Sequence, residues 1–358
     1  MKYEGALTLR EMNSMHPQRS IWLHPARPRS RGADGPVSPD QREPLNNPVR
    51  YSPGSNGVHR LALVTALATF PLLFVGGLVT SKGAGLAVPD WPTSFGHNMF
   101  LFPWSKMVGD IFYEHSHRLL ASGVGLLTVV LVVMIWLVEE RRWVRWLGAM
   151  ALALVIVQGV IGGLRVLLIE EVLAVVHACL AQAFFALTVS LALFTSREWR
   201  EKNQPIYGPD ASSIRRLCLL TFCMIYVQGA FGAILRYTGT RLDAHVVFAG
   251  LVTVHAILLA ARIHRHYSSE PMFSRPATVL LGLLVLQLAL GLASYLAKFT
   301  SLGMIFGGSL QVLLPTTHLV VGALMLVTSL VLTLRSYRLL ESPEFLVREG
   351  LASERFPA

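Results

Sequence analysis

The fold of this chain is decided by the stretch from Gln158 to His177, which reads QGVIGGLRVLLIEEVLAVVH. A related stretch runs from Gln228 to His245 and reads QGAFGAILRYTGTRLDAH. Both contain an apolar segment with small residues, then an arginine, then a histidine after a short connection. Small residues at roughly four-residue spacing let helix backbones approach closely in lipid. The recurrence predicts a repeated pair of membrane helices.

A weaker form of the pattern occurs twice more. Residues 287–291 read QLALG, and an earlier apolar run contains Gly76-Gly77. In each case we expect a glycine-bearing helix, an outer loop and a returning helix that opens with a histidine. Two such units make a four-helix bundle. We therefore predict an all-α polytopic membrane protein with eight transmembrane helices in two pseudo-symmetric four-helix bundles, whose returning helices begin with His117, His177, His245 and His318.

The composition agrees with a membrane protein. Of the 358 residues, 53% are hydrophobic and 15% are charged, whereas a soluble domain has about a quarter of its residues charged. The mean hydropathy is +0.51. A helix needs roughly 20 apolar residues to cross a bilayer. Eight runs meet this need, at about 61–80, 117–138, 146–165, 173–195, 217–236, 244–263, 277–297 and 316–335.

The positive charges are distributed asymmetrically. The net charge is +10, but most Arg and Lys residues lie in the N-terminal tail and in every second connection, at 139–145, 196–216 and 262–275. This is the pattern of the positive-inside rule, so we expect no nucleic-acid partner. We expect both termini in the cytoplasm and the protein in the cell (inner) membrane. The outer connections are then 81–113, 166–172, 237–243 and 298–315.

Four regions follow from these boundaries. Residues 1–58 are rich in Pro and Arg and are predicted to form a disordered basic cytoplasmic tail. Residues 59–200 and 201–340 are the predicted N-terminal and C-terminal bundles. Residues 341–358 are a predicted cytoplasmic C-terminal tail. The cysteines lie in apolar runs without a CxxC pair, so we expect them to pack in helices; they are Cys179, Cys218 and Cys223.

The four histidines are the candidate ligands. One histidine at a helix end is more often structural, but four at similar depth in a membrane indicate function. Two histidines from facing helices can supply both axial positions of a haem iron. Zinc or copper is the competing interpretation, but such sites usually need three or four clustered ligands. We predict one haem per bundle, and treat five others as bystanders: His97, His115, His255, His264 and His266.

Three further charged residues lie near this histidine layer. Arg165 and Arg236 end their apolar runs on the outer side, where a guanidinium can bind a haem propionate bidentately or simply reach the interface. Glu114 precedes His117 by three residues and shares its helix face. It is a candidate acid or base, or an acidic residue that complements the helix dipole.

The first outer loop is long and contains Pro89-Asp90-Trp91-Pro92. A loop of about thirty residues without its own helix is usually functional or disordered. The two prolines restrict the backbone here, so we expect an ordered lid in which Trp91 lies over the site.

These residues together resemble the haem A synthase family. The matching features are Gly76-Gly77, the loop GAGLAVPDWP at 83–92 and the motif EHSHR at 114–118, and the resemblance covers about 60–336. It implies an enzyme that oxidises the C8 methyl of haem O to the formyl group of haem A. It implies that His117 and His177 bind the substrate haem, with Glu114 in catalysis.

The resemblance also implies a haem b, held by His245 and His318, that relays electrons. The implied partners are the lipid bilayer, haem O delivered by the farnesyltransferase, an unidentified electron donor and terminal oxidase assembly. Two features depart from the family. Val88 stands where many members have a cysteine, and the connection at 237–243 is too short for the matching pair, so no loop disulfide is expected. Thr80 replaces a frequent arginine, for which Lys82 is a candidate substitute.

Two other classes of protein hold haem through histidine pairs. One is a di-haem b-type cytochrome that exchanges electrons with quinone, and the other is a haem transporter or chaperone. Glu114 in register with His117 and the Pro-Asp-Trp-Pro loop favour the enzyme. A farnesyltransferase is disfavoured, because no inner connection carries an Asp-rich diphosphate site.

Overall fold

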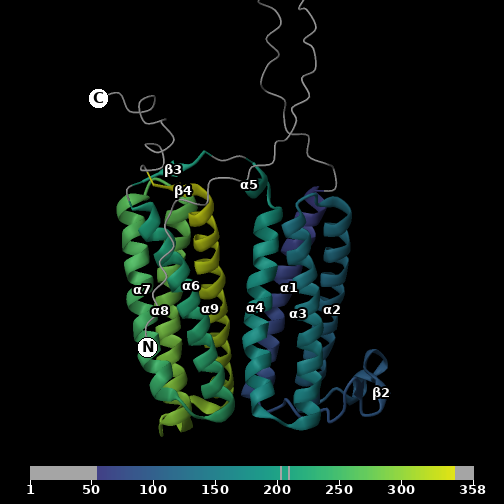
Figure 1. The fold of residues 1–358 in the computed structure, drawn as a ribbon. Helices are drawn as coiled ribbons and strands as arrows, with labels where there is room; N and C mark the ends of the chain where they lie inside the picture. Colours follow the sequence, from purple (N-terminus) through teal and green to yellow (C-terminus); the bar gives the residue numbers. More distant parts are fainter. Residues whose placement is uncertain (1–54, 202–203, 209, 343–358) are drawn as a thin grey trace, which may run out of the picture. The chain divides into compact units, whose positions relative to one another are not determined.

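The structure is a computed structural model, and it describes residues 55–201, 204–208 and 210–342. Its described part is almost entirely helical (Figure 1). Eight of the described helices are long and apolar enough to cross a membrane, which confirms the predicted all-α polytopic membrane fold. They are α1 (Ser55–Ser81), α2 (Gly109–Val138), α3 (Arg142–Leu168), α4 (Glu171–Thr195), α6 (Ala211–Thr238), α7 (Leu242–His266), α8 (Pro271–Phe299) and α9 (Gly303–Leu339).

The long helices form two groups that lie side by side in Figure 1. In the first group, α1 and α3 each pack against both α2 and α4. In the second group, α6 and α8 each pack against both α7 and α9. The seam between the groups is made by contacts of α1 with α9 and of α4 with α6 and α9. Leu73, Phe185, Ala323 and Val327 form a buried apolar cluster in this seam.

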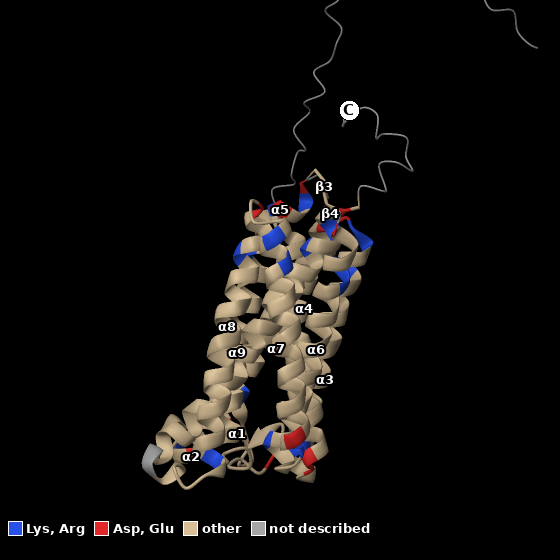
Figure 2. Cartoon of the chain, turned by 90° about the vertical axis from the view of Figure 1, so that its left-hand side faces the viewer, with Lys and Arg blue, Asp and Glu red and all other residues tan. Residues whose placement is uncertain are grey.

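Short elements connect the helices at one end. In chain order, helix α5 (Arg197–Arg200) and strand β3 (Ile206–Tyr207) come between α4 and α6. Strand β3 pairs in parallel with β4 (Leu340–Glu341), which follows α9. Figure 2 shows that Lys and Arg residues gather at this end of the helices, as the alternating basic connections predicted. We call it the basic end. The four histidines belong to the opposite half of the helices.

The helix boundaries correct three expectations. Helix α1 begins at Ser55, inside the predicted tail; the rest of that tail (1–54) and residues 343–358 lie outside the described residues. Helix α2 begins at Gly109, so His117 lies two turns inside it. The predicted outer loop at 298–315 is mostly helical, because α9 begins at Gly303 and bends at Gly307, where φ is 69°. A glycine tolerates this positive φ, and the chain continues as helix beyond the bend.

The loop between α1 and α2, which the sequence predicts to be an outer loop, is folded rather than extended. It contains a two-stranded hairpin, β1 (Thr93–Ser94) with β2 (His97–Asn98), and two 3-10 turns, η2 (Met99–Leu101) and η3 (Trp104–Lys106). The Asp90 carboxylate accepts hydrogen bonds from Phe95 N–H at 2.7 Å, Gly96 N–H at 2.9 Å and the Thr93 hydroxyl. Burial acts to raise the pKa of Asp90, but these hydrogen bonds outweigh it and lower the pKa to about 2.

Candidate functional site: four histidines against four glycines

Each candidate ligand faces a glycine of the preceding long helix. A methyl group added to the glycine would lie 2.9–3.2 Å from Cε1 of the imidazole, which is tighter than ordinary van der Waals contact. The glycine therefore lets the helix backbone approach the ring. The four contacts are Gly76 with His117, Gly162 with His177, Gly232 with His245, and Gly291 with His318. The predicted repeat is thus a repeated contact between helix backbone and imidazole.

A glutamine one turn before the glycine contacts three of the histidines. Gln158 Nε2 donates to the His177 carbonyl at 3.0 Å, and Gln228 Nε2 donates to the His245 carbonyl at 3.0 Å. Gln287 Nε2 lies 3.3 Å from His318 Nε2. A glutamine bonded to a helical carbonyl ties the two helices of a unit together. The sequence showed that these glutamines recur, but it gave them no role.

The histidines come together in the two predicted pairs. The His245 and His318 ring centroids are 6.3 Å apart, with an angle of 70° between the ring planes. His117 and His177 lie close enough for their charges to interact. The Nδ1 atoms of His117 and His177 are buried and have no hydrogen-bond partner among the described residues. Buried polar atoms are nearly always paired, so these two nitrogens indicate a group that the protein chain itself does not supply.

Each pair has at least one arginine within electrostatic range. Arg165 is in range of both His117 and His177, Arg118 is in range of His117, and Arg236 is in range of His318. Arg165 also lies over the Tyr237 ring, 5.8 Å from its centroid. Positive charge near each pair suits a ligand that carries carboxylates.

Arg236 makes contacts between helices that the sequence did not reveal. Its guanidinium donates to the Gly77 carbonyl and the Ser81 hydroxyl at 2.6 Å, and to the Pro315 carbonyl at 3.2 Å. Gly77 and Ser81 belong to α1 and Pro315 to α9, so Arg236 ties the two helix groups together across the seam. Its Nε has no partner among the described residues.

Glu114 is buried and holds the outer loop. Its carboxylate pairs with Arg118 one turn later at 2.7 Å and accepts the Val88 N–H at 2.8 Å. Arg118 in turn donates to the carbonyls of Val88 at 2.9 Å, Asp90 at 2.7 Å and Thr93 at 3.1 Å. We call Glu114 and Arg118 the loop clamp. The sequence motif contained Arg118 without a stated role, although the i, i+4 spacing of opposite charges was the available signal.

Trp91 and Gly85 attach the loop to the C-terminal end of α3. A methyl group on Gly163 would lie 2.3 Å from the Trp91 indole, and one on Gly85 would lie 2.3 Å from the Arg165 guanidinium. Gly162 and Gly163 therefore face different partners, the first His177 and the second Trp91. The side chain that the sequence placed over the site packs directly on the helix that also supports His177.

The remaining sequence candidates have ordinary contacts. His115 is buried and lies 3.1 Å from the Ser94 hydroxyl, so it supports the hairpin. His255 and His264 contact carbonyls of their own helix at 2.9 Å and 2.8 Å. All three cysteines are free. Among the described residues, no group of three or more His, Cys, Asp or Glu side chains gathers as a metal site.

The fold and the site define a class: a polytopic helical membrane protein with two pairs of histidines, each imidazole facing a glycine of a neighbouring helix. Residues 59–244 match the family of cytochrome oxidase assembly proteins (COX15-CtaA). Because the match covers more than half of the chain, the chain belongs to this family.

Several curated relatives are named Heme A synthase. The one from Shouchella clausii (strain KSM-K16) is 29% identical over 192 residues, which are 52% of this chain and 61% of the relative. The one from Oceanobacillus iheyensis is 25% identical over 279 residues, 68% of this chain and 86% of the relative. One from Listeria monocytogenes is 34% identical over 145 residues, 39% of this chain and 44% of the relative. The chain thus spans about three fifths of the first relative's length.

Proposed function

We propose that the protein is a haem A synthase, a membrane oxidoreductase that converts the C8 methyl group of haem O to the formyl group of haem A for terminal oxidases. The observation that carries the proposal is the paired arrangement of four histidines, each against a glycine and each pair near an arginine. The name of the relatives, Heme A synthase, supplies the product of the proposed reaction.

The chemistry of the residues fits haem. Two imidazoles from facing helices are a common axial ligand set for haem iron. The His245 and His318 centroids are 6.3 Å apart, so these two rings could hold one haem iron between them. The unpartnered Nδ1 atoms of His117 and His177 fit a site that is completed by a ligand. Arg165 and Arg236 would each pair with haem propionates.

The two pairs have different surroundings, and we assign them different roles. His117 and His177 lie beside the loop clamp and Trp91, so we place the substrate haem O there. The rings of His245 and His318 lie 3.2 Å and 3.3 Å from glutamine side chains, whereas Gln158 contacts only the His177 carbonyl, so we place a resident haem b at His245 and His318. A haem b held there would supply a one-electron carrier. Oxidation of the methyl group removes electrons from the substrate and adds one oxygen atom from water or dioxygen. An electron acceptor, or dioxygen together with an unidentified electron donor, is therefore needed beyond haem b.

Glu114 is the residue to which we assign a catalytic role. In the described structure its carboxylate contacts Arg118 and Val88 N–H, so it holds the loop as well. A negative charge fixed by an arginine beside a substrate site can accept or guide a proton. Glu114→Ala is expected to retain haem and to lose product. Normal haem A formation by this variant would contradict the catalytic role, and Glu114 would then only hold the loop.

The location and partners extend this proposal. The basic end would face the cytoplasm, which places the histidine pairs near the outer face of the inner membrane, with both termini inside. The two helix groups would act as a substrate bundle (59–200) and a haem b bundle (201–340). Haem O would arrive through the lipid bilayer or directly from the farnesyltransferase, and the product would pass to terminal oxidase assembly.

The proposal is tested by co-expressing the full chain with a source of haem O and identifying the extracted haems by mass spectrometry. We expect haem A and its hydroxylated precursor. A matched His177→Ala culture controls for background conversion. Bound haem without either product would contradict the synthase and indicate a di-haem cytochrome or a haem carrier.

A further inference from the structure

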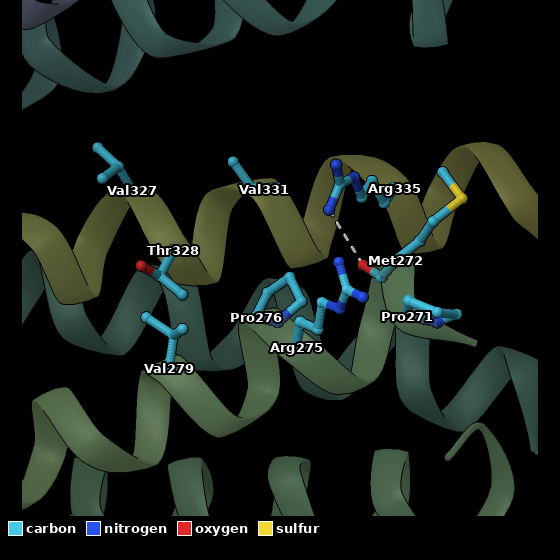
Figure 3. A pocket seen from close by; sticks show the side chains of 9 residues that line it. All are labelled: Pro271, Met272, Arg275, Pro276, Val279, Val327, Thr328, Val331 and Arg335. Carbon is cyan, nitrogen blue, oxygen red and sulfur yellow. Dashed lines mark hydrogen bonds between the residues drawn. The ribbon is translucent and has the colours of Figure 1, made fainter. Parts of the chain in front are cut away.

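A groove opens between α8 and α9 at the basic end of the helices. Its volume is about 480 Å³, and its walls combine apolar and cationic side chains (Figure 3). Val279, Val327 and Val331 line one part, and Arg275 and Arg335 lie at the other. The groove is therefore apolar toward the middle of the helices and basic toward their end.

Pro276 shapes the groove and fixes one of its arginines. A proline lacks the N–H that would bond the carbonyl four residues earlier, here that of Met272 in the first turn of α8. Arg335 Nη1 donates to this carbonyl at 3.1 Å. The Arg335 guanidinium also bonds both oxygens of Glu198 at 2.9 Å. Arg335 is thus held in place, and Glu198 compensates its charge.

Arg275 is in a different situation. It is exposed, and it has no hydrogen bond or ion pair with another described residue. Figure 3 shows its side chain beside Pro276, below Arg335 in that view. Val279 lies one turn further along α8 and is 52% exposed. An uncompensated cation therefore borders an apolar surface that the protein leaves open.

We propose that this groove binds one anionic phospholipid from the leaflet at the basic end. Its phosphate would pair with Arg275, and an acyl chain would lie along Val279 and Val331, with the buried Val327 at the floor of the groove. A small soluble anion would gain nothing from the valines, and a neutral lipid would gain nothing from Arg275. A lipid with a negative headgroup matches both halves, as expected for basic pockets between membrane helices.

This site is separate from the histidine pairs. Arg335 follows His318 by 17 residues in α9, or about 25 Å along a helix at about 1.5 Å per residue. The lipid site does not depend on the proposed synthase activity, so lipid binding and haem A formation can fail independently.

The test compares two lipids that differ only in headgroup. The full chain in a neutral detergent is titrated with dioleoyl phosphatidylglycerol or dioleoyl phosphatidylcholine, and bound lipid is counted by native mass spectrometry. We expect phosphatidylglycerol to bind more tightly. Arg275→Gln should weaken its binding about fivefold, the effect of one interfacial cation, and Arg275→Lys should restore most of it. The preference should shrink as salt is raised.

A matched control removes an exposed arginine elsewhere at the same end. Arg265 in α7 is exposed and is not part of the groove, so Arg265→Gln should bind phosphatidylglycerol as the unchanged protein does. A phosphatidylglycerol with a photoreactive group in its acyl chain should label peptides of α8 and α9 around Val279 and Val331. Equal binding of both lipids, equal loss in the two arginine variants, or labelling confined to other helices would overturn the proposal.

Discussion

Gly291 of α8 lies directly against the imidazole of His318 in α9, so that a methyl group on Gly291 would come within 3.0 Å of His318 Cε1. Interiors are close-packed, and an added carbon must displace its neighbours. The His318 ring can occupy this position only because Gly291 has no side chain. The same dependence holds for the other three histidines.

Gly291→Ala is expected to displace the His318 ring and to remove most of the low-spin spectrum of the haem b that we propose His245 and His318 bind. Gly282 in the same helix has no neighbouring atom within 4 Å of an added methyl group. Gly282→Ala is therefore the matched control. It should keep the spectrum and raise the melting temperature slightly, since alanine is favoured over glycine by about 1 kcal/mol in a helix. Similar spectra from the two variants would contradict the packing role of Gly291.

The contact between Trp91 and Gly163 predicts that α3 controls the outer loop. A methyl group on Gly163 would lie 2.3 Å from the indole, so Gly163→Ala should push Trp91 off the helix. We expect faster proteolysis of the loop and a loss of haem A formation. Gly159→Ala, at a position with open space, is the control. If both variants resist protease as the unchanged protein does, Trp91 does not depend on Gly163.

The loop clamp predicts coupling between Glu114 and Arg118. Their side chains are 5% and 10% exposed, so Arg118→Ala leaves a buried carboxylate without its partner and should destabilise the protein by about 3–5 kcal/mol. Adding Glu114→Gln removes that unpaired charge and should recover part of the loss. Melting temperatures of the two single variants and the double variant measure the coupling. Strictly additive effects on the melting temperature would show that Glu114 and Arg118 are not energetically coupled.

The lowered pKa of Asp90 predicts how the hairpin responds to acid. The folded pKa is about 2 against an ordinary value of 3.8, so the hydrogen bonds stabilise the hairpin fully above about pH 4. This stabilisation is lost as the pH falls from about 4 toward 2. Hydrogen exchange of the Phe95 and Gly96 amides, corrected for intrinsic rates, should therefore show protection that drops only in this range. Asp90→Asn should lower the protection of these amides at all pH values and remove the drop between about pH 4 and 2. If the Asp90→Asn protein shows the same pH profile as the unchanged protein, Asp90 is not the origin of the drop.

The sequence was sufficient for the membrane fold, because a helix that crosses lipid needs a long apolar run that composition alone reveals. The residue order also showed a repeated unit, in which a glycine-bearing helix is followed by a helix with a histidine. Helix ends were harder to predict. The bend at Gly307 allows helix α9 to continue on both sides, and polar or glycine-rich segments do not reveal whether a chain bends or stops.

Contacts between distant segments could not be read from the residue order. Arg236 bonds to Gly77 and Pro315, and this arrangement exists only once α1, α6 and α9 are packed together. The loop clamp likewise joins Glu114 to Val88, 26 residues earlier. The Arg275 groove depends on which face of α8 remains uncovered. These features arise from tertiary packing, for which a single sequence carries no periodic signal.

The most direct test of two unlike haem sites is to identify the haems that remain when each pair is broken. The full chain with His117→Ala or with His245→Ala is purified after co-expression with a haem O source, and its extracted haems are quantified by mass spectrometry. We predict that His117→Ala retains haem b and lacks haem O and haem A. We predict that His245→Ala lacks haem b and retains haem O. Loss of the same haem from both variants, or of none from either, would contradict the assignment.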